Sequence, residues 1–151
     1  MKSQITSSTR SSWTELAPST ATGQPTYGQL VDLVERYFAA LDDGDLDAVL
    51  EHYADDAVFT VQSAHSPHHG RDTGIRSMYE EFIGSFRKIR HIHFRHVVDV
   101  ENCRIASQFR AEMTDHEGND VVLTSCNFFY VRDGKFERVY VYMSDGINVL
   151  K

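Results

Sequence analysis

The C-terminal half of the chain carries long runs of β-branched and aromatic residues, and these runs constrain the fold more than any other feature. The runs are "RHIHFRHVVDV" (90–100), "RIASQFRAEMT" (104–114), "DVVLTSCNFFYV" (120–131) and "KFERVYVYM" (135–143). The connections "ENC", "DHEGN" and "RDG" have the turn chemistry of β-hairpins. The sequence therefore predicts an antiparallel meander.

Helical periodicity precedes the meander. Thr26 and Gln29 have the spacing of a capping box, and apolar residues then recur with helical period as far as Leu41. Asp45 can cap a second helix, "LDAVLEHYA", and apolar positions of a third helix run from Ile75 to Phe86. Between the second and third helices, "DDAVFTVQS" predicts a strand and "SAHSPHHGRD" a loop. This order predicts an α+β fold with helices on one face of a curved sheet.

Length and composition predict one domain behind a short arm. The chain has 151 residues, 41% of them hydrophobic and 25% charged, which suits a single globular core. Residues 1–25 are rich in Ser and Thr and predict a flexible N-terminal arm, with Trp13 as its exception, so the domain is expected over 26–151.

Charge and cysteine content indicate which partners and which compartment to expect. The formal net charge of −7 argues against nucleic acid, whose phosphates attract a basic surface. No apolar run is long enough to span a membrane, and no hydrophobic segment follows the N-terminal lysine. Cys103 and Cys126 have no metal-type spacing and are expected to stay reduced. A cytoplasmic protein is expected.

The densest histidine cluster lies in the first run of the meander. His91, His93 and His96 fall within six residues. Strand alternation places His91 and His93 on one face and His96 on the other, unless a bulge intervenes. A pair two residues apart can bind a metal if a third ligand is present. It can also serve in proton transfer, because the pKa of imidazole lies near 6.5, or it can line a pocket mouth without a chemical role. No metal and no cofactor are predicted.

The stretch "VERYFAALDDGDLDAVLEHYADDAVF" resembles the nuclear transport factor 2-like superfamily, and within it the SnoaL-like proteins, ketosteroid isomerase and scytalone dehydratase. The resemblance runs from about Tyr27 to Leu150. It implies a cone-shaped α+β barrel, three N-terminal helices packed on a mostly antiparallel sheet, and a homodimer. It leaves the activity open, because the superfamily includes enzymes and proteins without catalysis.

Carried over residue by residue, the resemblance to ketosteroid isomerase implies part of a catalytic site. Tyr37 falls where that enzyme has its oxyanion-hole tyrosine, and Asn127 falls where it has a second donor. Its general base falls at Val61, whose alkyl side chain cannot accept a proton. The usual isomerase mechanism is therefore not expected.

The resemblance to scytalone dehydratase implies a different base. Ser125 and Asn127 resemble its serine and asparagine, and either His91 or His93 matches its histidine. Its tyrosine pair is loosely matched by Tyr37 and Tyr53. Asp145 is a further candidate, as a base, as a group that orients a histidine, or as an ordinary turn residue before Gly146.

An apolar pocket is expected between the helices and the sheet. Its predicted wall residues are Tyr53, Phe59, Val61, Met78, Phe82, Phe109, Phe129 and Met143, beside Tyr37 and Ser125. Such a pocket suits a small hydrophobic, cyclic or polyketide-like molecule.

Three functions remain open from the sequence. The first is a cofactor-independent lyase or isomerase of the dehydratase type, with a polyketide cyclase as a close alternative. The second is a ligand-binding or dimerisation module without catalysis. The third, epoxide hydrolysis, requires an Asp–Arg–Asp relay, for which only Arg95 is a candidate.

Overall fold

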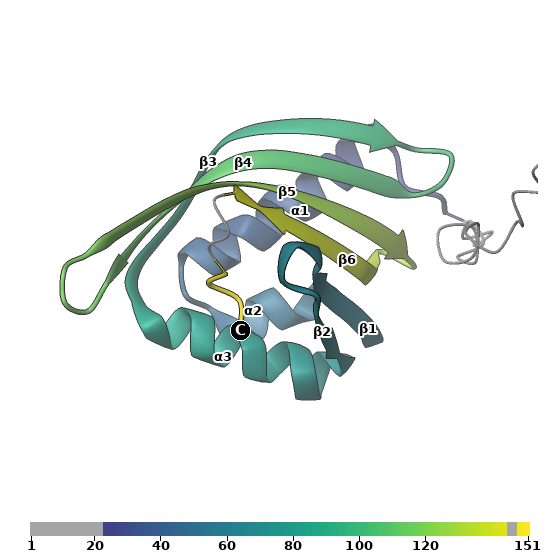
Figure 1. Cartoon of the computed structure of the whole chain (residues 1–151). Coiled ribbons are helices and arrows are strands. Elements are labelled where there is room, and N and C mark those ends of the chain that lie inside the picture. Colours follow the sequence, from purple (N-terminus) through teal and green to yellow (C-terminus); the bar gives the residue numbers. More distant parts are fainter. Residues whose placement is uncertain (1–22, 145–147) are drawn as a thin grey trace, which may run out of the picture.

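In a computed structural model that describes residues 23–144 and 148–151, three helices cover one face of a curved, six-stranded sheet (Figure 1). The sheet order is β2-β1-β6-β5-β4-β3, so β2 and β3 are its edges and the sheet does not close. The α+β architecture predicted from the sequence is confirmed, with an open cone in place of a closed barrel. Among the described residues no helix is long and apolar enough to cross a membrane.

Helix α1 (Tyr27–Asp42) begins at the predicted capping box. The side chain of Thr26 accepts from the backbone N–H of Gln29, and the Gln29 side chain accepts from the backbone N–H of Thr26. Two donors at the start of the helix are thereby satisfied. Helix α2 (Leu46–Glu51) is capped by Asp45, as predicted, and helix α3 spans Arg76–Ser85.

The four predicted C-terminal runs form strands, one beside the next. They are β3 (Phe86–Asp99), β4 (Arg104–Asp115), β5 (Asp120–Arg132) and β6 (Lys135–Met143), each antiparallel to the one before it. Strand β1 (Tyr53–Val61) joins β6 in parallel. This parallel pairing places β1, the first strand in the chain, beside β6, the last one.

The segment predicted as a loop after β1 contains regular structure, so that prediction is wrong in part. Residues Ser66–His69 form a short strand, β2, antiparallel to β1. A turn of π-helix, Gly70–Ile75, then leads into α3. The histidines and proline of this segment gave no alternating apolar pattern, because β2 is an edge strand whose side chains are exposed or only half-buried.

A β-bulge in β3 changes which histidines share a face. The register with β4 shifts between Ile92 and Arg95, and His93 adopts a left-handed backbone with φ of 58°. One extra residue in a strand reverses the alternation beyond it. Consequently His91 and His96 both face the helices, whereas His93 is exposed. The prediction that His91 and His93 share a face is wrong for this reason.

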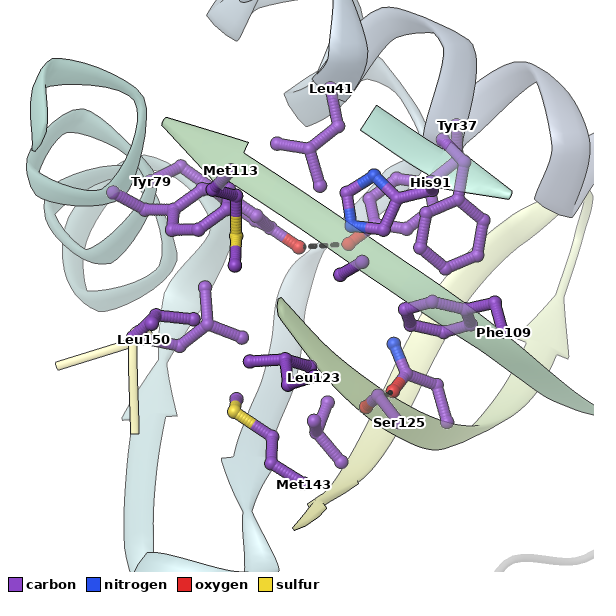
Figure 2. Close-up of a pocket in the computed structure, with 16 residues that line it drawn as sticks. Tyr37, Leu41, Tyr79, His91, Phe109, Met113, Leu123, Ser125, Met143 and Leu150 are labelled. Atoms are coloured by element: carbon purple, nitrogen blue, oxygen red, sulfur yellow. Dashed lines mark hydrogen bonds between the residues drawn. The ribbon is translucent and has the colours of Figure 1, made fainter. Parts of the chain in front are cut away.

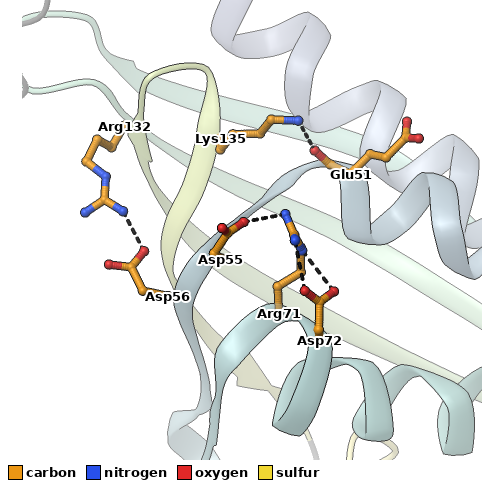
Figure 3. A network of polar contacts seen from close by, with 7 residues as sticks. All are labelled: Glu51, Asp55, Asp56, Arg71, Asp72, Arg132 and Lys135. Carbon is orange, nitrogen blue, oxygen red and sulfur yellow. Dashed lines mark hydrogen bonds and ion pairs between the residues drawn. The ribbon is translucent and has the colours of Figure 1, made fainter.

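Ion pairs connect the start of β1 to the segment before α3 and to the end of β5 (Figure 3). Arg71 lies between Asp55 and Asp72, with nitrogen–oxygen distances of 2.6 and 2.9 Å. Arg132 reaches Asp56 at 2.6 Å from the β5–β6 hairpin. These carboxylates are exposed, so each pair stabilises the fold only slightly and mainly fixes geometry.

Candidate functional site

A small pocket opens between α1, α3 and the concave face of the sheet (Figure 2). Its lining is mostly apolar, and the volume of the cavity is about 30 Å³. The lining residues are Tyr37, Phe38, Leu41, Tyr79, Phe82, His91, Phe109, Ala111, Met113, Leu123, Ser125, Asn127, Val141, Met143, Val149 and Leu150. A few polar groups therefore converge in an apolar cavity, the usual composition of a small-molecule site.

His91 is the histidine that lines this pocket, and Asp42 holds it. The Nδ1 atom of His91 lies 2.5 Å from Oδ1 of Asp42, and the backbone N–H of His91 donates to Oδ2 of the same carboxylate at 3.1 Å. The His91 side chain is only 6% exposed and that of Asp42 27%. A carboxylate on Nδ1 favours the tautomer with its proton on Nδ1, which leaves Nε2 free to accept a proton.

Two aromatic rings also pack against the His91 ring. Its centroid lies 4.8 Å from the ring of Phe38 on α1 and 5.2 Å from the ring of Phe109 on β4. Phe109 in turn pairs with Ser125 across the sheet. The imidazole is therefore held between α1 and β4, beside the part of β5 that carries Ser125.

Ser125 and Asn127 supply the second polar group of the pocket. Both are buried, and the hydroxyl of Ser125 lies within hydrogen-bond distance of two acceptors, Oδ1 of Asn127 at 3.0 Å and the backbone carbonyl of Tyr142 at 3.1 Å. Because the amide oxygen of Asn127 faces this hydroxyl, the amide NH₂ remains as a donor. Such a donor can stabilise an oxygen that gains negative charge.

Three buried tyrosines form a chain of hydroxyls beside the pocket. Tyr79 is bonded through its hydroxyl to Tyr37 and, at 2.6 Å, to Tyr53. Two hydrogen bonds use two of the three hydroxyl protons, so a third proton is left for another acceptor. Tyr37 and Tyr79 line the pocket, so an oxygen atom of a bound molecule can accept this proton whenever it lies on either of these two hydroxyls.

Burial keeps these phenols protonated. Desolvation raises the pKa of Tyr37 to about 12, against a smaller opposing effect of the hydrogen bond with Tyr79. Burial also raises the pKa values of Tyr53 and Tyr79 well above their usual range. The three groups are therefore hydrogen-bond donors throughout the neutral range.

The raised pKa of Tyr37 predicts a loss of stability in alkali. An unfolded tyrosine ionises near pH 10, whereas Tyr37 in the folded chain ionises near 12, so its contribution is complete below pH 10 and is lost as the pH rises towards 12. Two pKa units correspond to about 2–3 kcal/mol. Urea unfolding measures the free energy of unfolding at pH 9 and at pH 11.5. The drop in this free energy between the two pH values should be smaller for Tyr37→Phe than for the parent chain. Equal differences would contradict the burial argument.

The structure places the remaining predicted residues in two groups. Phe82, Phe109 and Met143 line the pocket with Tyr37, His91, Ser125 and Asn127. Others that were expected in the wall are buried but belong to the packed core and do not line it: Tyr53, Phe59, Val61, Met78 and Phe129. Tyr53 still reaches the site through Tyr79.

Three further candidates do not reach the pocket or are not described. His93 is exposed and lies outside it, so its proposed place at the site is incorrect. His96 is held between Ser107 and Glu35, at 2.8 and 3.1 Å, and does not line the pocket either. Asp145 and the arm residues 1–22 lie outside the described residues.

Metal binding and the epoxide hydrolase relay find little support in the pocket. Within the described part of the chain, no group of three His, Cys, Asp or Glu residues is placed to hold a metal ion. Arg95 is exposed, and no arginine is found among the lining residues that the structure describes. The polar chemistry of the site consists of an imidazole, an amide and hydroxyls.

Comparison with solved structures shows the same fold in several proteins. A protein from Xanthomonas campestris pv. campestris, provisionally named a polyketide cyclase, matches with a TM-score of 0.69 and 24% identity over 76% of this chain and 90% of that one. A Mycobacterium tuberculosis LEH-like epoxide hydrolase matches with a TM-score of 0.68 and 19% identity over 80% and 86%. A protein from Bacillus subtilis, provisionally named an isomerase, matches with a TM-score of 0.69 and 13% identity over 78% of this chain and 88% of that one.

Sequence comparison identifies the family. No curated protein matches the chain in sequence. The SnoaL-like domain family matches residues 34–139, which include α1 from its middle, strands β1 to β5, the first part of β6 and the polar groups of the pocket. The chain therefore belongs to the SnoaL-like domain family.

Proposed function

We propose that the chain is a cofactor-independent lyase or isomerase, acting as a dehydratase on a hydroxylated cyclic ketone. The observation that carries this proposal is the contact between His91 and Asp42 in a pocket that also holds hydrogen-bond donors. The amide of Asn127 and one hydroxyl of the tyrosine chain, that of Tyr37, are those donors. A base and an oxyanion site together are what enolate chemistry requires.

The reaction proceeds by proton transfer alone. Nε2 of His91 takes a proton from the carbon next to the substrate carbonyl, the electron pair of the broken C–H bond forms a C=C bond, and the π pair of the carbonyl moves to its oxygen. Donors from Asn127 and Tyr37 hold that enolate oxygen. When the carbonyl re-forms, the C–O bond of the β-hydroxyl breaks, and the leaving oxygen takes the proton back from Nε2 as water. Asp42 stabilises the imidazolium between these steps.

A polyketide cyclase is the closest alternative, because it uses the same enolate. In that reaction the carbon of the enolate attacks a second carbonyl of the same molecule, and no water need leave at that stage. Proteins provisionally named polyketide cyclases are among the structural neighbours of this chain. The enolate-stabilising groups named above serve both reactions equally.

Deuterium incorporation tests the proposed reaction. The protein is incubated in D₂O with a panel of cyclic β-hydroxy ketones, and mass spectrometry follows both loss of water and exchange next to the carbonyl. We expect one or both, and we expect Asn127→Leu to reduce either rate by about 10²–10³-fold through loss of an oxyanion donor. If no ketone of the panel shows water loss or exchange, the result would favour a module that binds a ligand without catalysis.

We further propose that two copies associate through the outer face of the sheet. Four of the exposed large apolar residues lie on its strands: Val97, Val122, Phe128 and Tyr142. A continuous row crosses the strands from Val97 through Ala106 and Phe128 to Tyr140. Asp99 and Arg104 lie beside this row and carry opposite charges. In a two-fold contact the same face of both copies meets, so each copy presents a positive and a negative group to the other.

Sedimentation velocity tests this association. Phe128→Glu places a charge in the apolar row and should convert a dimer to a monomer without loss of fold, because its side chain is partly exposed. Tyr27→Glu is the matched control, since Tyr27 is also an exposed aromatic residue but belongs to α1. A monomer for the parent chain at micromolar concentration would refute the proposal.

A further inference from the structure

The last residues of the chain form part of the pocket wall. Val149 and Leu150 line the pocket, and Leu150 is 9% exposed although it follows the last strand. Figure 2 shows Leu150 reaching into the space that Leu123, Met113 and Met143 also face. In Figure 1 the C-terminal end lies between the sheet and helix α3. The end of the chain therefore helps to fill the gap between the two layers.

The pocket in this form is too small for the substrate class proposed above. The cavity volume of about 30 Å³ accommodates roughly two water molecules. Pockets for molecules with one or two carbon rings are larger, commonly ~300 Å³ or more. Some part of the wall must therefore move before such a molecule can bind.

The C-terminal residues are the part of the wall with the weakest attachment. The other lining residues lie on α1, α3, β3, β4, β5 and β6, whose backbones are held by helix or sheet hydrogen bonds. For residues 148–151, by contrast, the hydrogen bond present in the described structure joins the N–H of Leu150 to Oδ1 of Asn148, within the segment itself. Apolar contacts of Val149 and Leu150 are what hold this segment in place.

We propose that Leu150, together with Val149, is a displaceable wall that determines the size of the apolar ring the pocket accepts. The side chain of Leu150 occupies space that a ring of the substrate takes when it binds. The inference rests on the proposed function only for the nature of the ligand, since the contacts themselves are independent of any reaction. It makes Leu150 a residue of specificity, distinct from the groups that transfer protons.

Binding of 1-naphthol, a neutral two-ring phenol, tests the role of Leu150. Isothermal titration should show about tenfold tighter binding to Leu150→Ala and to a chain that ends at Asn148, because no side chain has to be displaced. Leu150→Trp should bind about tenfold more weakly. Lys151→Ala should match the parent chain, since Lys151 is exposed and does not line the pocket.

A second control separates a displaced wall from general loosening of the fold. Leu30 is fully buried on α1 and does not line the pocket, so Leu30→Ala should lower stability but leave naphthol affinity unchanged. Equal or weaker binding by both Leu150→Ala and the shortened chain, or no binding by any of the variants, would overturn the proposal. If the variants show the expected affinities but no ketone is turned over, the proposed role of Leu150 stands and the proposed reaction is rejected. If a ketone is turned over but the affinities do not follow the expected pattern, the reaction stands and the role of Leu150 is rejected.

Discussion

Replacing His91 with glutamine should lower kcat by about 10²–10⁴-fold, the range expected when a general base is lost. The side chain lines the pocket between Phe38 and Phe109, and no other imidazole among the described residues does so. Glutamine can fill much of the same space and can still bond to Asp42, but it cannot accept a proton near neutral pH. Steady-state kinetics on the ketone that incorporates deuterium measures the effect. KM should change far less than kcat, since ring binding depends on the apolar wall.

His93 offers the matched control for this experiment. It lies two residues away on the same strand and is exposed outside the pocket because of the bulge. His93→Gln should therefore retain parental kcat within about twofold, because surface substitutions rarely disturb a site. Equal losses in the two variants, or full activity in His91→Gln, would contradict the assignment of His91 as the base.

Much of the fold was accessible from local sequence signals. Thr26 and Gln29 specify the start of α1 through a capping box that needs no tertiary contact. The alternating runs and their turns specify β3 to β6 for the same reason. Strand β2 was missed, because its residues Ser66–His69 bury little and depend on pairing with β1. Four half-buried or exposed residues leave little apolar pattern, even though β2 pairs with the strand just before it in the chain.

The candidate site was less accessible, because it depends on non-local contacts. The resemblance to scytalone dehydratase singled out Ser125 and Asn127, and both line the pocket, but strand alternation failed at His93, where one extra residue reversed the pattern. Asp42 does not stand out in the sequence, because it belongs to the polar stretch "DDGD" that follows the apolar period of α1. Its spacing of four residues from Phe38 on the same helix was the available signal. Its partner lies 49 residues away, and no local pattern predicts such a contact.

Replacing Asp42 with asparagine should lower kcat about as much as replacing His91, even though the two side chains have nearly the same shape. The backbone N–H of His91 donates to Oδ2 of Asp42, so the amide oxygen of asparagine should take this acceptor position. Its NH₂ group then faces Nδ1 of His91 in place of Oδ1. An NH₂ donor requires Nδ1 to be an acceptor, which moves the imidazole proton to Nε2. The nitrogen that faces the substrate can then no longer accept a proton, and a loss of about 10³–10⁴-fold is expected from the wrong tautomer.

The second histidine–carboxylate pair of the protein provides the control. Glu35 on α1 bonds to Nε2 of His96 at 3.1 Å, but His96 lies outside the pocket. Glu35→Gln makes the same carboxylate-to-amide change and should leave kcat within about twofold of the parent, because Glu35 is half exposed. ¹⁵N chemical shifts of the imidazoles report the tautomer directly, and they should show the proton on Nε2 of His91 only in Asp42→Asn. A large loss of kcat with the proton still on Nδ1 would mean that Asp42 acts through its charge, by stabilising the imidazolium, and not by fixing the tautomer.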